Sequence, residues 1–224
     1  MLNTEPSRLY NNNDMVKIGC HDCAGCSSCC EDMGQSIWLD PYDIYNLTMH
    51  LNKSMEELLQ KEVELHVEEG LIMPNIRMAE NNRMRCSFLD ENGRCGIHAY
   101  RPGYCRLFPL GRHYEEGKLS YFVLEDACPV PNKSKLKINK WLGVPKIKEY
   151  EHFVEEWHGL TKGLRNFFTE QGSAKAEDAI IKALNMQFLQ IFYLTSYEEE
   201  DFYGQFAVRM EQMKQVIKQL GIIF

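Results

Sequence analysis

Five thiols stand within eleven residues in Cys20-His21-Asp22-Cys23-Ala24-Gly25-Cys26-Ser27-Ser28-Cys29-Cys30. Gaps of two residues separate the first four cysteines, and the last two are adjacent. A hydrophobic core gains nothing from this spacing, whereas a metal centre needs three or four sulfurs to converge near one point. Several intervening residues are small, so the loop can fold tightly and turn N–H groups toward the sulfurs. The stretch predicts a metal-binding loop, with a disulfide-stapled loop as the alternative.

The composition favours metal binding over disulfides. The chain has 224 residues, of which 44% are hydrophobic and 25% charged, as in ordinary globular proteins. Residues 1–18 are polar and lack the apolar region of a signal peptide, and no apolar run approaches membrane-spanning length. We therefore expect a cytoplasmic protein with no membrane segment, in a reducing compartment where clustered cysteines more often bind metal than form disulfides. The net charge of −7 argues against nucleic acid as the main partner.

Four further cysteines follow in a stretch whose pattern indicates short strands and turns: Cys86, Cys95, Cys105 and Cys128. Asp90-Glu91-Asn92-Gly93 predicts a turn that joins strands at 84–89 and 94–97. A second hairpin is predicted around Glu115-Glu116-Gly117-Lys118. Two of these cysteines flank the first turn, as the metal ligands of a knuckle often do.

The cysteine pattern resembles the CxxCxxCC family, the YkgJ-type cysteine cluster proteins, which are described as zinc- or iron-chelating. The matching elements, in order, are Cys23-x-x-Cys26-x-x-Cys29-Cys30, Cys86-x-Phe88-Leu89, Cys95-Gly96-Ile97-His98, Arg101-Pro102-x-x-Cys105-Arg106-x-Phe108-Pro109 and Cys128. The resemblance implies a ligand set of Cys23, Cys26, Cys29, Cys30, Cys86, Cys95, Cys105 and Cys128. Cys20 lies outside the motif, so we expect a spare thiol there, and His98 stands where a tyrosine is common and is not taken as a ligand.

Eight thiolates suggest two centres or one larger assembly, because four satisfy a tetrahedral zinc ion or a four-iron cluster. The repeated two-residue spacing and the Cys128-Pro129 pair favour an iron–sulfur cluster, with zinc as the alternative. Arg101 and Arg106 flank Cys105, and we expect them to bind at the cofactor by neutralising its negative charge and donating to sulfur. Their alternative role is to hold an anionic substrate or a carboxylate of a partner.

Helix signals appear outside the cysteine-rich stretch. Asp40-Pro41 predicts one helix start, and the capping box that begins at Ser54 predicts a second helix with an apolar face from Met55 to His66. Residues 129–140 are rich in lysine and proline and predict a linker. From Pro145 onward, aromatic and methionine stripes predict helices that form a core or a homodimer face.

The predicted fold class is α+β. A flexible lead-in at 1–19 precedes a metal-centred cysteine module at 20–130, and a helical domain follows at 145–224. Two functions fit this organisation. The first is a metal-binding protein that serves in electron transfer, in metal handling or through a protein partner. The second is a metal-dependent enzyme, because flagellin lysine N-methylases carry a similar cluster. No nucleotide-binding glycine loop, nucleophile elbow or S-adenosylmethionine signature occurs, so the question of enzymatic activity stays open.

Overall fold

The computed structural model describes residues 8–20, 26–79, 84–170 and 175–222. It confirms the predicted α+β class, with small antiparallel hairpins and a helical C-terminal region. The chain forms two compact units, each built from two segments. Unit 1 combines Met1–Gly34 with Met78–Glu155, and unit 2 combines Gln35–Arg77 with Glu156–Phe224. The predicted domains at 20–130 and 145–224 are stretches expected to fold independently. The two units do not test that expectation, so the domains stay a prediction.

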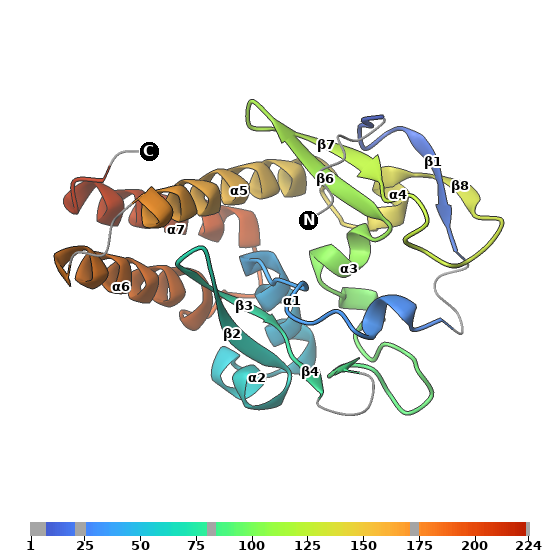
Figure 1. Ribbon diagram of the computed structural model, residues 1–224, viewed down its shortest axis with the longest axis horizontal. Helices are drawn as coiled ribbons and strands as arrows, with labels where there is room; N and C mark the ends of the chain where they lie inside the picture. The colour runs from blue at the N-terminus through green and yellow to red at the C-terminus, as the bar shows by residue number, and fades with distance from the viewer. Residues whose placement is uncertain (1–7, 21–25, 80–83, 171–174, 223–224) are drawn as a thin grey trace. The chain divides into compact units, whose positions relative to one another are not determined.

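Unit 1 is made of short strands and short helices joined by turns (Figure 1). Its elements are β1 (Met15–Gly19), the 3₁₀ turn η2 (Ser28–Cys30), β4 (Met78–Ala79), β5 (Arg85–Cys86), the 3₁₀ turn η3 (His98–Tyr100), α3 (Gly103–Leu107), β6 (Leu110–Glu115), β7 (Lys118–Val123), β8 (Ser134–Lys137), α4 (Ile138–Leu142) and the first part of α5 (Ile147–Glu170). The strands pair two by two, as β1 with β8, β4 with β5 and β6 with β7.

The hairpin of β6 and β7 confirms the prediction around residues 115–118. Glu115 pairs with Lys118, and Glu116 and Gly117 between them have φ of 48° and 77°, the left-handed conformations of a two-residue turn. Tyr121 of β7 is buried, and its hydroxyl donates to Glu151 Oε1 at 2.9 Å. This bond and the burial fix β7 against the first part of α5.

The predicted linker at 129–140 is wrong. Residues 134–137 form β8, which pairs with β1 in the antiparallel register Val16 to Leu136, and α4 follows directly. All four residues of β8 are exposed, so the strand lacks the alternation of buried apolar and exposed polar residues by which strands are predicted. The strand exists because its backbone pairs with β1, whose Val16 and Ile18 are buried.

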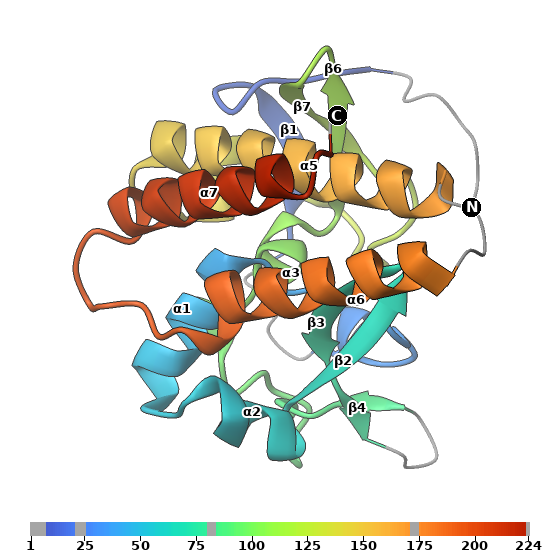
Figure 2. The same cartoon turned by 90° about the vertical axis from the view of Figure 1, so that its left-hand side faces the viewer.

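Unit 2 is mainly helical, and α6, α7 and the later part of α5 run side by side in Figure 2. Its elements are α1 (Pro41–Leu51), α2 (Met55–Lys61), β2 (Val63–Glu68), β3 (Leu71–Ile76), the residues of α5 from 156 onward, α6 (Lys175–Leu189), the π-helical turn η4 (Gln190–Leu194) and α7 (Phe202–Gln219). None of the described helices is both long enough and apolar enough to cross a bilayer.

Both predicted helix starts in unit 2 are confirmed, each with a complete capping box. At α1, the Asp43 N–H donates to Asp40 Oδ1 at 2.9 Å and the Asp40 N–H donates to Asp43 Oδ2 at 3.1 Å. At α2, Ser54 and Glu57 exchange the same pair of bonds. These bonds satisfy backbone donors that a helix start leaves without partners.

The prediction that α2 continues to His66 is wrong, because the helix ends at Lys61 and residues 63–68 form β2. Glu69 and Gly70 have φ of 50° and 81° and turn the chain into β3. The side chain of Asn185 in α6 then holds the hairpin, since it accepts from the Ile72 N–H at 2.7 Å and donates to the Gly70 carbonyl at 2.9 Å. A contact from a distant helix therefore overrides the local helical periodicity.

An aromatic core holds unit 2 together. Trp157 stacks on Phe188 with ring centroids 5.3 Å apart and meets Phe192 edge to face at 5.1 Å. Arg209 of α7 is buried beside this core, and its guanidinium lies over the ring of Tyr197 at 3.5 Å. It donates to one carbonyl within η4, that of Ile191 (2.8 Å), and to two just after it, those of Thr195 (2.7 Å) and Ser196 (2.7 Å).

Candidate metal centre

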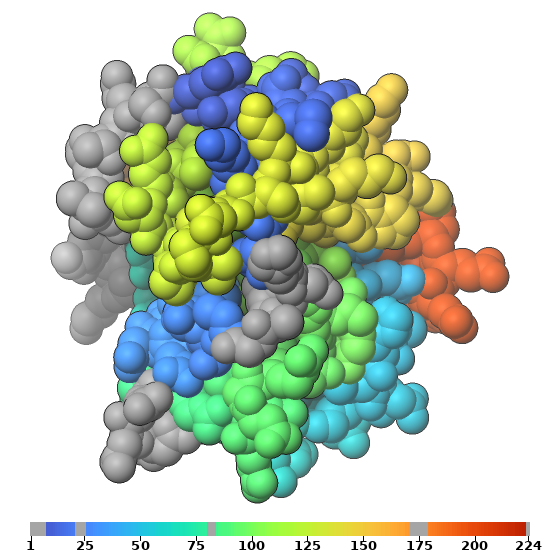
Figure 3. All heavy atoms as spheres, turned by 90° about the vertical axis from the view of Figure 1, so that its right-hand side faces the viewer, coloured from blue at the N-terminus to red at the C-terminus, as the bar shows by residue number. Residues whose placement is uncertain are grey.

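All the predicted metal ligands belong to unit 1. Cys23 lies outside the described residues, and none of the described cysteines is in a disulfide: Cys20, Cys26, Cys29, Cys30, Cys86, Cys95, Cys105 and Cys128. The segment that carries η2 (blue) and the green segment that follows β4 meet on one face of unit 1 in Figure 3. The backbone joins them, since Glu31 bridges to Arg85 and the Asp32 N–H donates to the Met84 carbonyl at 3.2 Å.

Five of the predicted ligands form one electrostatically connected set, here called the five-thiol group: Cys29, Cys30, Cys86, Cys95 and Cys105. Cys30 donates a hydrogen bond to the sulfur of Cys29, and this bond lowers the pKa of the Cys29 thiol to about 6 despite its burial. The same bond, together with burial and the neighbouring thiols, raises the pKa of Cys30 well above its ordinary value. A thiol whose pKa is lowered in this way is readily deprotonated, and a metal that binds the thiolate releases the proton to solvent.

Cys86 and Cys95 begin two turns of the same form. The backbone amide two residues later, from Phe88 or Ile97, hydrogen-bonds to the cysteine sulfur. The amide three residues later donates to the cysteine carbonyl, from Leu89 at 3.0 Å and from His98 at 3.3 Å. Burial raises the pKa of Cys86 to about 11 and raises the pKa of Cys95, while the amides oppose this shift. Amides that donate to sulfur stabilise a thiolate once a metal replaces the proton.

Arg101 lies within electrostatic range of the five-thiol group, where its charge lowers the pKa of both Cys29 and Cys95. Its guanidinium contacts the ring of His98 and lies 6.0 Å from the ring centroid of Trp141. Its Nε is buried and has no hydrogen-bond partner among the described residues. A buried donor beside thiols fits a negatively charged thiolate centre, which would supply the missing acceptor.

Arg106 is placed differently from Arg101. It donates to the Ala99 carbonyl at 2.8 Å and approaches the Leu142 carbonyl at 3.5 Å. These bonds tie α3 to η3 and α4. Its role at a cofactor stays a prediction.

A second set of thiols lines a small cavity of about 20 Å³ in unit 1. Its walls are Cys20, Cys26, Ser28, Cys29, Phe108, Pro109, Cys128, Pro129 and Val130. Cys20, expected to be a spare thiol, therefore lies at the same cavity as three motif cysteines. Sequence reasoning left it out because it precedes the motif, although its two-residue gap to Cys23 continues the spacing.

The thiols gather without closing on one point. Among the described residues, which omit 21–25 and 80–83, no three Cys, His, Asp or Glu side chains stand close enough together to hold a metal ion. The donor chemistry nevertheless fits a thiolate-bound metal, because Cys29 and Cys30 share a hydrogen bond, Cys86 and Cys95 receive backbone amides, and Arg101 carries a buried donor nearby.

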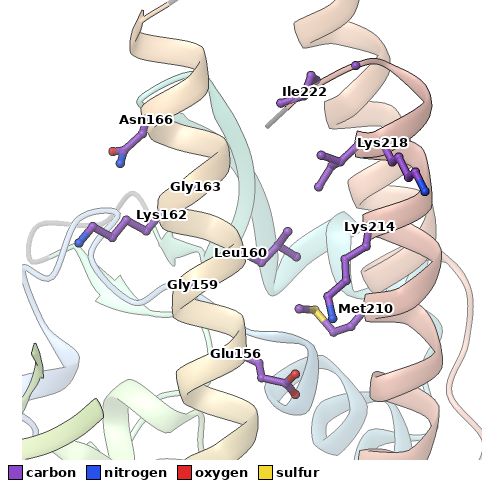
Figure 4. Close-up of a pocket in the computed structure, with 12 residues that line it drawn as sticks. Glu156, Gly159, Leu160, Lys162, Gly163, Asn166, Met210, Lys214, Lys218 and Ile222 are labelled. Carbon is purple, nitrogen blue, oxygen red and sulfur yellow. The ribbon is translucent and has the colours of Figure 1, made fainter. Parts of the chain in front are cut away.

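Unit 2 holds a larger cavity, of about 860 Å³, between α5 and α7 (Figure 4). Leu160 projects from α5 toward α7, and Met210 lines the facing wall. Lys162 points away from the space between the helices, whereas Lys214 extends from α7 into it beside Met210. No cysteine lines this cavity.

Comparison with known proteins bears on the cysteine-rich stretch. Residues 22–129 match the family model CxxCxxCC, described as a "putative zinc- or iron-chelating domain". No curated protein and no solved structure matched the chain. The match begins at residue 22, so it includes all eight predicted ligands and leaves out Cys20. The resemblance inferred from the cysteine spacing is thereby confirmed: residues 22–129 are similar to the CxxCxxCC domain.

Proposed function

We propose that the five-thiol group holds an iron–sulfur centre and that the protein serves in electron transfer or metal handling through a protein partner. The observation that supports the proposal is the electrostatic coupling among thiols of three chain segments, at residues 29–30, 86–95 and 105. Cys23, between Cys20 and Cys26 in sequence, is a further ligand in this proposal.

Two features favour iron–sulfur chemistry. The set has more sulfurs than the four that one tetrahedral ion takes, and the two-residue spacing of the first cysteines is typical of cluster ligands. Hydrogen bonds from the amides of Phe88 and Ile97 to sulfur, with the charge of Arg101 nearby, are the means by which proteins tune the potential of a cluster.

Zinc is the second candidate, and the paired turns at Cys86 and Cys95 favour it. Structural zinc sites commonly take their ligands from two such turns, each of which aims its sulfur at the ion. Zinc would satisfy the same thiolates without redox activity, and its role would be structural.

The test is anaerobic purification of the full chain from iron-replete cells, followed by absorption spectroscopy and analysis of metal and acid-labile sulfide. A coloured protein with iron matched by sulfide, which bleaches on reduction, is the expected result. A colourless protein with stoichiometric zinc and no sulfide would replace the cluster with zinc. A protein without either metal would overturn both readings.

A metal-dependent enzyme related to protein lysine N-methylases is the alternative, and the apolar cavity of about 860 Å³ in unit 2 favours it. Its size lies within the range of small-molecule sites, roughly 300 to 1,000 Å³. Calorimetric titration of the purified protein with S-adenosylmethionine tests this alternative. Binding that Leu160→Trp abolishes and Lys162→Ala preserves would support it, since Leu160 points into the space between the helices and Lys162 points away from it. Absence of binding would remove it.

A further inference from the structure

The cavity of about 860 Å³ in unit 2, here called the α5–α7 cavity, runs along both helices (Figure 4). Its lining extends from Glu156 to Asn166 on α5, and from Met210 to Ile222 on α7 and the residues that follow it. At the rise of an α-helix, residues 156–166 span about 15 Å. The acyl chain of a lipid spans one leaflet, which is half of the roughly 30 Å hydrocarbon core of a bilayer. The cavity therefore has the length of a single acyl chain.

The floor of the α5–α7 cavity is apolar. Leu160, Met210, Ile217 and Ile222 all line it, and all four are buried. Gly159 contributes a stretch of wall without a side chain, and a Cβ built on it would meet nothing within 4 Å. An apolar chain that displaced water from this floor would gain the free energy of apolar burial.

The charged side chains of the lining favour an anion. Lys162, Lys214 and Lys218 outnumber the carboxylate of Glu156. Lys214 extends into the space between the helices (Figure 4). Its ion pair with Glu211, at 2.6 Å, is exposed on both sides and therefore contributes little stability, so the carboxylate of a ligand can replace Glu211.

We propose that the α5–α7 cavity binds a free long-chain fatty acid, with its carboxylate on Lys214 and its chain along Leu160 toward Ile222. The site uses no thiol, so it goes beyond the metal-binding function proposed above. It also differs from a site for S-adenosylmethionine, because the positive sulfonium of that molecule would be opposed by the lysines. The response of binding to single charges therefore separates the two ligands.

Calorimetric titration of the full chain with dodecanoate, below its micelle-forming concentration, tests the proposal. The wild type should bind one equivalent. Lys214→Gln should weaken binding about tenfold, because it removes the charge that meets the carboxylate. Glu156→Gln should tighten binding, because it removes a carboxylate that repels the ligand. Lys162→Gln is the matched control and should stay within about twofold of the wild type, since that side chain points away from the cavity and its charge is screened.

Gly159→Leu tests where the chain of the ligand lies. The new side chain starts in open space and should fill part of the cavity. Leucine suits a helix interior better than glycine, so the variant should fold, with the circular dichroism and thermal midpoint of the wild type or better. Loss of dodecanoate binding by this folded variant is the expected result, and wild-type affinity would exclude the α5–α7 cavity as the site.

The other outcomes are equally decisive. If the wild type does not bind dodecanoate, or if Lys214→Gln binds it as the wild type does, the proposal is overturned. Dodecanol that binds as tightly as dodecanoate would remove the role of the carboxylate. Co-sedimentation with phosphatidylglycerol vesicles, without binding of dodecanoate, would replace the free fatty acid with a membrane surface. Binding of S-adenosylmethionine that Lys214→Gln strengthens and Glu156→Gln weakens would assign the cavity to the enzymatic alternative. Metal content is measured separately, so failure here leaves the proposed metal centre standing.

Discussion

Leu89 and Cys95 face each other across an isolated antiparallel bridge, which closes the loop between the two cysteine turns of unit 1. Inside the loop, Asp90 Oδ1 accepts from the N–H groups of Asn92 at 2.9 Å and Arg94 at 2.8 Å. The Asp90 N–H donates in turn to the Arg94 carbonyl at 2.8 Å. One carboxylate therefore sets the distance between the turns of Cys86 and Cys95.

Asp90→Ala should weaken metal binding without removing a ligand. Loss of the two bonds to Asp90 Oδ1 should cost about 1 kcal/mol of loop stability, which corresponds to roughly fivefold weaker binding. Competition with a chromophoric chelator measures this change. Asp90→Asn is the matched control, because its amide oxygen can accept the same two bonds, and it should stay close to the wild type. Equal affinities for all three proteins would show that the loop does not position the sulfurs.

Removal of metal should unfold the cysteine-rich part of unit 1, at residues 26–34 and 84–130, and leave unit 2 folded. The ladder of β4 and β5 has only two residues in each strand, so thiolate–metal bonds should supply much of the stability of this region. Hydrogen exchange with mass spectrometry, before and after anaerobic chelation, measures protection along the chain. Residues 156–222 should stay protected because Trp157, Phe188 and Phe192 pack without metal. Undiminished protection of the hairpins after complete metal removal would contradict this prediction.

Arg101→Ala should speed metal loss to a chelator by about tenfold. Its charge lowers the pKa of Cys29 and Cys95, and its buried Nε has no partner among the described residues. A charge-assisted hydrogen bond contributes roughly 1.5–3 kcal/mol. Arg101→Lys should give an intermediate rate, because lysine keeps the charge and loses the planar fork. Arg94→Ala is the control, since that side chain is exposed. Equal rates for Arg101→Ala and Arg94→Ala would assign Arg101 a packing role only.

Arg209→Met should lower the free energy of unfolding of unit 2 by roughly 3 kcal/mol, because it leaves carbonyls at the end of η4 without their donors. Chemical denaturation followed by tryptophan fluorescence reports the change, since Trp157 lies in the same core. Val208→Ala, at a neighbouring position that is 59% exposed, should stay within about 0.5 kcal/mol of the wild type. A similar loss of unfolding free energy in both variants would show that substitutions destabilise unit 2 wherever they fall in α7.

Short sequence motifs predicted the helix starts and the turn that depend only on neighbouring residues. The capping boxes at Asp40 and Ser54 and the turn at Glu116-Gly117 depend on neighbours within a few residues, and all three are present. The predicted hairpin around Asp90 is confirmed only as the single bridge of Leu89 to Cys95, because Arg85 and Cys86 pair with β4 instead.

Elements held by distant partners were not predictable in the same way. The β2–β3 hairpin depends on Asn185, more than a hundred residues later in the sequence. Strand β8 depends on its pairing with β1, more than a hundred residues earlier. The candidate site follows the same rule. Spacing predicted the motif cysteines as ligands, but it could not predict that Cys20 lines the small cavity, because Cys20 follows β1, which is held by its pairing with β8.

The division of each unit into two chain segments has a consequence for biosynthesis. All nine cysteines have been added to the chain once residue 128 is synthesised, before any residue of α6 or α7. The thiols can therefore meet metal on the nascent chain. Residues 35–77 must meanwhile wait for partners, since the Leu39 carbonyl receives its bond from Tyr193 and the β2–β3 hairpin receives its bonds from Asn185. During translation, the apolar face of this early segment is the part of the chain that depends on protection from chaperones.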